Sequence, residues 1–219
     1  MTVNDDILAV ARDRLIAEGN AVLALVDALD ETFVRAASMI RACKGKLFIG
    51  GSGTSGTVAR RMAHIFSVTG TPSLAFSPID SLHGSSGAIT PVDLVLLISN
   101  GGASDEVIQI AGIARRRGSS VIAVTRSHET PLARTANHSV VVAVDSRADL
   151  GGIIATGITV AQSAWGDAMA EVLMRGRGYT WREFMSTHPA GAVSMIEDLP
   201  ANPSPLFIPS VATENGANR

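Results

Sequence analysis

Two similar stretches constrain the fold more than any other feature of this chain. In each, a short apolar run breaks into glycine and hydroxyl residues before a segment with helical spacing begins. The first spans 47–56 and contains Gly51-Ser-Gly-Thr-Ser-Gly56, and the second spans 93–106 and contains Ser99-Asn-Gly-Gly102. Such continuous apolar runs are typical of strands that are buried on both faces of a parallel sheet. A strand, a glycine turn and a helix N-terminus together bind phosphate, because free N–H groups and the helix dipole favour an anion there.

Strand-like and helix-like segments alternate along the rest of the chain. Strands are predicted at 47–49, 72–76, 93–99, 119–125 and 139–144, and helices at 54–68, 107–117, 131–136 and 156–175. Residues 5–41 predict two more helices, and Thr180 is the expected N-cap of another. This alternation predicts an α/β fold, a three-layer αβα sandwich with a parallel sheet. We expect an N-terminal helical segment at 1–45, a binding domain at 46–196 and a disordered tail at 197–219.

The composition excludes several classes of protein. Hydrophobic residues make up 46% of the 219 residues and charged residues only 17%, so we expect some surface to be buried between subunits. The net charge of −2, with no basic stripe, argues against a nucleic-acid partner. Cys43 is the single cysteine, and no acidic or histidine cluster has metal-ligand spacing, so no metal site is expected. The N-terminus is unlike a signal peptide and no apolar run reaches membrane-spanning length, which predicts a cytoplasmic protein without a membrane partner.

The first glycine turn allows three functional interpretations. Gly51, Gly53 and Gly56 match the dinucleotide pattern G-x-G-x-x-G, but that site also needs an acidic residue about 20 positions later, and none occurs before Ile79. The Gly-Lys-Ser/Thr of a Walker loop is absent. The remaining functional interpretation is a hydroxyl-rich loop that binds a small phosphorylated ligand. The alternative is a turn with a purely structural role.

Other residues could take part in chemistry beside such a loop. If the two strands are neighbours, Ser52, Ser55, Ser99 and Ser104 converge on one crevice at the carboxyl ends of the strands. Glu106 begins the helix after the second turn. Its carboxylate either interacts favourably with the helix dipole or acts as a general base. Two histidines, His83 and His188, stand in irregular segments, and spacing alone leaves a packing role and a proton-transfer role equally open for them.

Together these stretches resemble the sugar isomerase (SIS) domain family, and within it the arabinose-5-phosphate isomerase branch. The matching pieces lie in family order between Lys46 and Val193: Gly51-Ser-Gly-Thr-Ser-Gly56, Thr69-Gly-Thr-Pro72, Leu82-His-Gly84, Ile98-Ser-Asn-Gly-Gly102, Ser104, Glu106, Leu132-Ala-Arg134, Gly166-Asp167 and His188-Pro-Ala-Gly-Ala192. The His-Pro-x-Gly-Ala element is the most branch-specific of them.

The resemblance implies a flavodoxin-like fold with five parallel strands, assembled as a dimer or tetramer with sites at subunit interfaces. It assigns the catalytic carboxylate to Glu106 and two site histidines to His83 and His188. The candidate binding residues, most of them in the two turns, are Ser52, Gly53, Thr54, Ser55, Ser99, Asn100, Ser104, Arg147 and Thr156. The implied activity is a cofactor-free aldose–ketose isomerisation of a phosphorylated sugar through a cis-enediol.

Departures from the branch put the identity of the sugar in doubt. Thr54 stands where the branch has lysine, and Arg147 stands where it has a second glutamate. The run Leu150-Gly-Gly-Ile-Ile-Ala-Thr156 also differs, and no C-terminal regulatory repeats follow. Arg147 is therefore a candidate for a new contact to phosphate or carboxylate. The expected function is a sugar-phosphate isomerase with a different substrate; the alternative is a non-catalytic regulatory protein that binds a phosphosugar.

Overall fold

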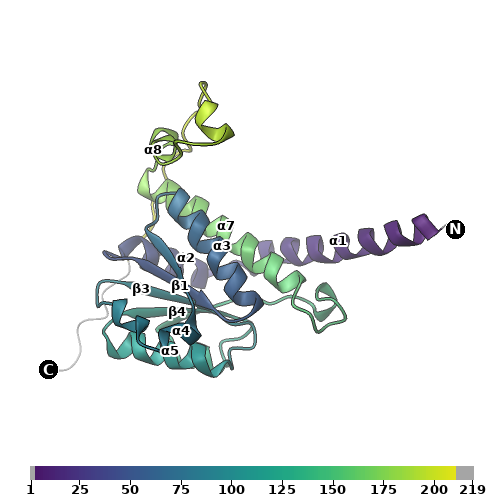
Figure 1. The fold of residues 1–219 in the computed structure, drawn as a ribbon, viewed down its shortest axis with the longest axis horizontal. Helices are drawn as coiled ribbons and strands as arrows, with labels where there is room; N and C mark the ends of the chain where they lie inside the picture. The colour runs from purple at the N-terminus through teal and green to yellow at the C-terminus, as the bar shows by residue number, and fades with distance from the viewer. Residues whose placement is uncertain (1–2, 211–219) are drawn as a thin grey trace.

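Five parallel strands form one sheet in the order β2-β1-β3-β4-β5. Their bounds are β1 Leu47–Gly51, β2 Ser73–Phe76, β3 Leu94–Ile98, β4 Ser120–Thr125 and β5 His138–Val141. The computed structural model describes residues 3–210, and Figure 1 shows the sheet between two layers of helices. This strand order is the flavodoxin-like one, so the predicted αβα sandwich is confirmed.

Helices cover both faces of the sheet, and 3-10 turns connect some of them. The bounds are α1 Val3–Ala28, α2 Glu31–Ala42, α3 Thr54–Val68, α4 Pro78–Ser81, η1 Ser85–Ala88, α5 Asp105–Arg116, α6 Pro131–Thr135, η2 Ser146–Ala148, α7 Gly157–Arg177, α8 Trp181–Ser186 and η3 Ala192–Met195. Helices α2, α3 and α7 pack on one face, and α5 and α6 pack on the other. Within residues 3–210, no helix is both long and apolar enough to cross a bilayer.

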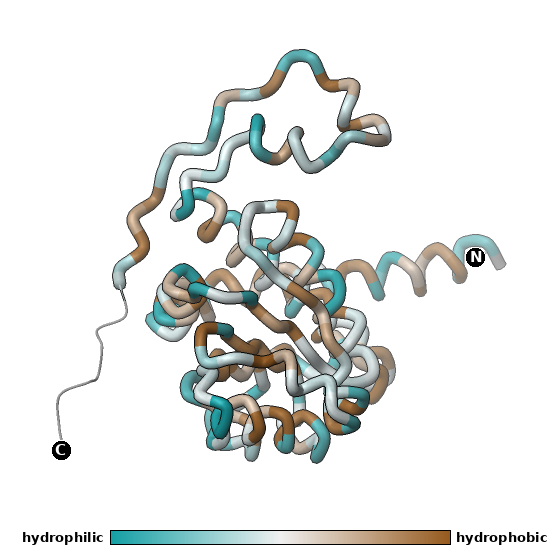
Figure 2. The backbone as a smooth tube through the Cα atoms, turned by 60° about the vertical axis from the view of Figure 1, so that its left-hand side comes forward, coloured by the Kyte–Doolittle hydropathy of each residue, from teal (hydrophilic) through white to brown (hydrophobic). Residues whose placement is uncertain are grey.

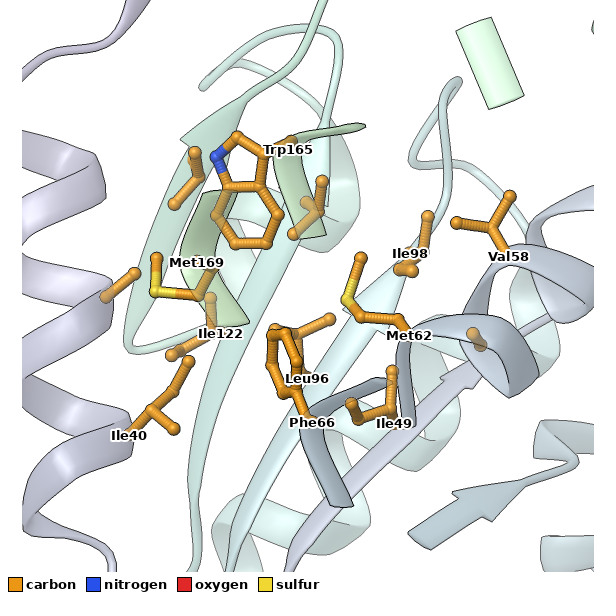
Figure 3. Packing of buried hydrophobic residues seen from close by; sticks show 14 of the residues in the cluster. Ile40, Ile49, Val58, Met62, Phe66, Leu96, Ile98, Ile122, Trp165 and Met169 are labelled. Carbon is orange, nitrogen blue, oxygen red and sulfur yellow. The ribbon is translucent and has the colours of Figure 1, made fainter. Parts of the chain in front are cut away.

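The strands divide their side chains between two cores, because successive residues of a strand point to opposite faces. Leu94, Leu96 and Ile98 of β3 face α3 and α7, whereas Val95 and Leu97 face α5. Figure 3 shows the larger core, in which side chains from α2, α3 and α7 meet those of the strands. The central strand β3 is thus buried on both faces, as its continuous apolar run predicted.

Helices α3 and α7 lie side by side and run in the same direction. Arg61 of α3 forms two 2.8 Å bonds with the carboxylate of Asp167 in α7. Two residues after the last residue of each helix, Gly70 lies against the ring of Tyr179. Both helices therefore begin at the carboxyl edge of the sheet and end at the opposite edge, about 20 Å away for the 15 residues of α3.

Two segments project from this body. Helix α1 packs along α7 with its C-terminal half, and its N-terminal half extends into solvent (Figure 1). Ile7 and Val10 on this half are 62% and 72% exposed. At the other end of α7, the chain after α8 leaves the body as a loop and returns beside it (Figure 2).

Some predicted boundaries differ from the structure for identifiable reasons. The β5 strand ends at Val141, not at residue 144, because β4 ends at Thr125, whose carbonyl accepts the last bond from Val142 N at 2.9 Å. The α5 helix begins two residues earlier than predicted, at Asp105. Its acidic first turn, Asp105 and Glu106, suits the positive end of the helix dipole.

Part of the segment predicted as a disordered tail, up to Ser210, contacts the domain in the structure. Leu206 N donates to Arg175 O at 3.3 Å, and the Ile208 side chain packs against Gly176. Trp181 Nε1 donates to Ala201 O at 3.1 Å. These two hydrogen bonds and one apolar contact attach the segment to α7 and α8, and its polar, proline-rich composition did not predict them. Residues 211–219 lie outside the described residues, and the domain boundaries stay predictions.

Candidate functional site

The two glycine turns lie next to each other at the carboxyl edge of the sheet. Strands β1 and β3 are neighbours, with Gly51 opposite Ile98. Glycine is required at Gly51, since an added Cβ would come within 2.9 Å of the Ile98 and Ser55 carbonyl oxygens. Gly53 has a φ of +56°, which other residues rarely adopt. The expected convergence of the two turns is therefore present in the structure.

The helices that start at these turns have unsatisfied N-termini. Four other helices are capped by the side chain of their N-cap residue: Asp30, Ser77, Thr130 and Thr180. In α3 and α5 the N-cap residues are Gly53 and Ser104, and neither provides a side-chain cap. The first N–H groups of both helices are thus left for an external acceptor, and the helix dipoles favour an anion at that place.

Serine hydroxyls stand beside these amides. Ser99 Oγ accepts from Gly102 N at 3.2 Å and lies 3.5 Å from Ser104 Oγ. Ser52 Oγ is buried and has no hydrogen-bond partner among residues 3–210. Leaving a buried hydroxyl unpaired costs about 1–3 kcal/mol, so an acceptor at this place would be favoured. Together with half-buried Ser55, these hydroxyl and amide groups suit a small anion, and we call this place between the two turns the crevice.

The remaining predicted residues of the two turns differ in their exposure and in their hydrogen bonds. Glu106 is half-buried in the first turn of α5, and within the described residues its carboxylate makes no hydrogen bond or ion pair. Asn100 O accepts from Thr125 Oγ1 and Arg126 N, both at 3.1 Å, which fixes the second turn to the end of β4. Thr54 is exposed at the start of α3, where it supplies a hydroxyl but no charge.

Arg147 and Thr156 lie instead on the loop between β5 and α7. The side chains of both make hydrogen bonds to other residues of the protein. The Arg147 guanidinium makes two bonds to Asp145, of 2.7 and 3.0 Å, and these lower the pKa of Asp145 to about 2. Thr156 Oγ1 accepts from Arg14 and Leu150 and donates to Ala148 O, which uses its full capacity. The Thr156 hydroxyl therefore has no capacity left for a ligand, whereas exposed Arg147 keeps three of its five N–H donors, including both on Nη1.

The structure does not bring His188 to the crevice of its own chain. His188 follows α8, at the end of α7 that is farthest from the turns. Its Nδ1 lies 2.8 Å from Phe184 O, and its ring stacks on Phe184 at 3.9 Å. His83 follows α4 and is exposed, without a side-chain hydrogen bond to any described residue.

Sequence reasoning missed three residues that hold the loop between β5 and α7 in place. Asp149 accepts from Thr156 N and Ile158 N, both at 3.0 Å, and so caps α7 from outside the usual N-cap position. Asp145 pairs with Arg147, and Arg14 reaches the loop from α1. The short spacing of Asp145 and Arg147 was a usable signal, whereas no local pattern identifies Arg14. No three His, Cys, Asp or Glu side chains of residues 3–210 gather into a metal-binding group.

Comparison with known proteins identifies the family of this chain. A model of the SIS domain family matches residues 39–172. The chain belongs to the SIS domain family. It is 34% identical over 188 residues to arabinose 5-phosphate isomerase KdsD of Escherichia coli K12, and 33% identical over 193 residues to KdsD of Pseudomonas aeruginosa PAO1. These alignments cover 86% and 88% of this chain but only 57% and 59% of the two enzymes, so the chain spans little more than half of their length.

A solved structure agrees with this SIS assignment. A protein of Escherichia coli CFT073, determined in complex with a sugar phosphate, superposes with a TM-score of 0.83 at 31% identity. The match covers 86% of this chain and 100% of that one. The resemblance noted from the motifs is thereby confirmed at the level of family and fold.

Proposed function

We propose that this SIS domain binds a phosphorylated sugar in the crevice between its two glycine turns and interconverts its aldose and ketose forms. The observation that carries the proposal is the pair of uncapped helix N-termini on neighbouring strands, beside the unpaired hydroxyl of Ser52. Relatives named arabinose 5-phosphate isomerase support it. We assign the binding domain to residues 46–196.

The reaction moves a proton between adjacent carbons through a cis-enediol. It needs a base over the C–H bond, a donor to the carbonyl oxygen and an anchor for the far end of the open-chain sugar. Ser55, Ser99 and Ser104 anchor the phosphate together with the α3 and α5 amides. Glu106, whose carboxylate has no partner among the described residues, is the base. His83 assists ring opening or carries protons between the sugar oxygens.

His188 enters this scheme from a second copy of the chain. The 21 residues of α7 separate it from the crevice of its own chain by about 30 Å. In a dimer or tetramer whose α7 helices run in opposite directions, the α8 end of one copy faces the crevice end of the other. We therefore place the complete site between subunits.

The substrate of this scheme is a phosphosugar other than arabinose 5-phosphate, because the protein offers different polar groups at two positions of the site. Thr54 offers a neutral hydroxyl at the start of α3, and Arg147, although paired with Asp145, keeps free guanidinium donors on Nη1. A thermal-stabilisation screen of phosphorylated pentoses, hexoses and sugar acids identifies the preferred sugar. The sugar that raises the unfolding midpoint most is then used in the kinetic test.

The decisive test compares Glu106→Gln with Asp105→Asn, its neighbour in the same helical turn. Glu106→Gln removes the basicity and keeps the size, so binding should change little while turnover falls by roughly 10²–10⁴-fold. Asp105→Asn alters the charge at the helix N-terminus equally and should retain most of the activity. Incorporation of solvent deuterium at the sugar carbon, followed by NMR, reports enediol formation even for a poor substrate.

Two outcomes would overturn the proposal. A phosphosugar that binds tightly but shows no exchange from acid to mildly basic pH would make this protein a non-catalytic phosphosugar sensor. Unchanged binding after Ser55→Ala and Ser99→Ala would show that the phosphate site is elsewhere, since hydrogen bonds to a charged group contribute about 1.5–3 kcal/mol each.

A further inference from the structure

The Arg14 side chain attaches α1 to the rest of the domain by hydrogen bonds. Its Nη1 donates to Thr156 Oγ1 at 3.3 Å and its Nη2 donates to Arg147 O at 2.9 Å. Arg14 is half-buried, whereas residues 4–13 of the same helix are all exposed. The guanidinium fork therefore marks the boundary between the packed half of α1 and the half that projects into solvent.

The loop that Arg14 holds, residues 145–156, has few other attachments. Thr156 Oγ1 accepts from Leu150 N at 3.2 Å and donates to Ala148 O at 3.4 Å. Asp149 ties the end of the loop to the first amides of α7. These bonds join the loop to itself and to α7, and Arg14 is the residue that joins it to α1 by side-chain hydrogen bonds.

The loop ends at the N-terminus of α7, which lies beside the N-terminal half of α3, the helix that carries Ser55. Its last residue, Thr156, is the N-cap of α7. The N-terminal halves of α7 and α3 share a groove of about 530 Å³, whose lining runs from Thr57 and Thr159 to Arg61 and Asp167. Thr57 is two residues from Ser55, one of the proposed phosphate ligands. A shift of the loop would thus move the α7 N-terminus against the helix that carries Ser55.

We propose that Arg14 is a positioning residue of the phosphosugar site, through which the placement of α1 controls ligand affinity. The inference rests on the proposed function, because it concerns the same crevice. Arg14 acts through Thr156 and the Arg147 carbonyl and does not touch the ligand. Two donors at fixed spacing are needed for these two acceptors, and a planar guanidinium provides them where a lysine ammonium does not.

Assembly and ligand binding are linked through this residue. A second copy that covers the exposed apolar side chains of α1, such as Ile7 and Val10, fixes the direction of the helix that carries Arg14. Linkage is reciprocal for binding free energies, so the ligand should strengthen self-association by the factor by which assembly strengthens ligand binding.

The test uses Arg14→Met and Arg14→Lys in the full chain, with Arg12→Met as the matched control. Arg12 is exposed on the same helix and makes no side-chain hydrogen bond to a described residue. Titration calorimetry with the phosphosugar that gives the largest thermal stabilisation in the screen, and with inorganic phosphate as a second probe, should give a Kd about tenfold higher for both Arg14 variants, with circular dichroism unchanged. The control should keep the Kd of the parent protein. Thr156→Val should weaken binding similarly, and combining it with Arg14→Met should add little.

Failure of the inference can be told from failure of the proposed function. If the parent protein binds and both Arg14 variants bind equally well, Arg14 does not position the site and the proposed function stands. If the parent protein binds neither probe, the proposed function fails, and amide hydrogen exchange then tests the positioning role alone. Exchange across residues 148–158 should be about tenfold faster in Arg14→Lys than in Arg12→Met, and equal exchange would overturn the inference. The conservative lysine variant keeps the test usable if Arg14→Met does not fold.

Discussion

At the scale of single residues, Asp93 ties together the two strands that carry the crevice. Its carboxylate accepts from Lys46 N at 2.7 Å, Thr90 N at 2.7 Å and Thr90 Oγ1 at 2.6 Å. Burial raises the pKa of Asp93, but these hydrogen bonds outweigh burial and hold the pKa below its ordinary value. Lys46 and Asp93 directly precede β1 and β3, so one carboxylate fixes the amino ends of both strands.

We expect Asp93 to stabilise the fold in a pH-dependent way. Because its pKa is depressed in the folded state, its contribution is present above the ordinary value of 3.8 and is lost as the pH falls through the folded pKa. Asp93→Asn should lower the free energy of unfolding at pH 7 by about 1–3 kcal/mol. It should also flatten the decline of stability below pH 4, as measured by urea unfolding.

The exposed Asp27 provides the control for this experiment. Asp27→Asn should leave both the stability and its acid dependence near those of the parent protein. If the Asp93→Asn and parent curves stay parallel from pH 5 to pH 2, the Asp93 carboxylate does not have the depressed pKa that its hydrogen bonds indicate.

At the scale of elements, the β1–α3 turn combines a steric requirement with its proposed binding role. The Gly51 backbone lies so close to the carbonyl oxygens of Ile98 and Ser55 that there is no room for a side chain. Gly101 of the second turn has no atom within 4 Å of an added Cβ, and its φ is not positive. The two glycines look equivalent in sequence but differ in how tightly they are enclosed.

Gly51→Ala should therefore destabilise the protein by about 1–3 kcal/mol, since the backbone must move to accept the methyl group. The same movement should abolish phosphosugar binding, because the turn and the α3 amides would no longer fit together. Gly101→Ala should be close to neutral in thermal unfolding and in calorimetric binding. Equal stability of the two variants would show that the turn is less tightly packed than its distances indicate.

The elements themselves were predictable because their signals are local. The apolar run before Ser99 and the glycines after Ile49 specify strand, turn and helix through neighbouring residues alone. The contact between Arg14 and Thr156 spans 142 residues and depends on how α1 is set along α7, which no local pattern records. The remoteness of His188 from its own crevice has the same origin, because the direction of α7 relative to α3 is a tertiary property. The roles of the candidate site residues stay predictions.

At the scale of the whole molecule, the two projecting segments lie at opposite ends of α7 (Figure 1). Both expose apolar side chains, including Val10 at one end and Met195 and Phe207 at the other. Exposed apolar surface of this kind usually marks an interaction site. A dimer or tetramer would cover it, and the proposed exchange of His188 between copies requires one.

We expect light scattering at micromolar concentration to report a dimer or tetramer. Ile7→Glu combined with Val10→Glu should shift the population to smaller species, since charges replace apolar contacts in an interface that must bury roughly 1,200–2,000 Å² to be stable. Asn4→Glu adds a charge to the same exposed half of α1 and serves as the control. A parent protein that is monomeric at this concentration would contradict the assembly and remove the proposed role of a neighbour's His188.

The two cores of the sheet are completed at different times during synthesis. The core beneath α5 and α6 draws its buried residues from Ile89 to Leu132. The core on the other face joins Ile49 of β1 to Trp165 of α7, which the ribosome adds more than a hundred residues later. At about 5–20 residues per second, Ile49 waits roughly 6–25 s for that cover. During this interval α2 and α3 cover only part of this apolar face of the sheet, and the part beneath α7 stays open. A chaperone that shields the open part should raise the yield of folded protein, and a stop codon placed just before α7 should yield an aggregating product.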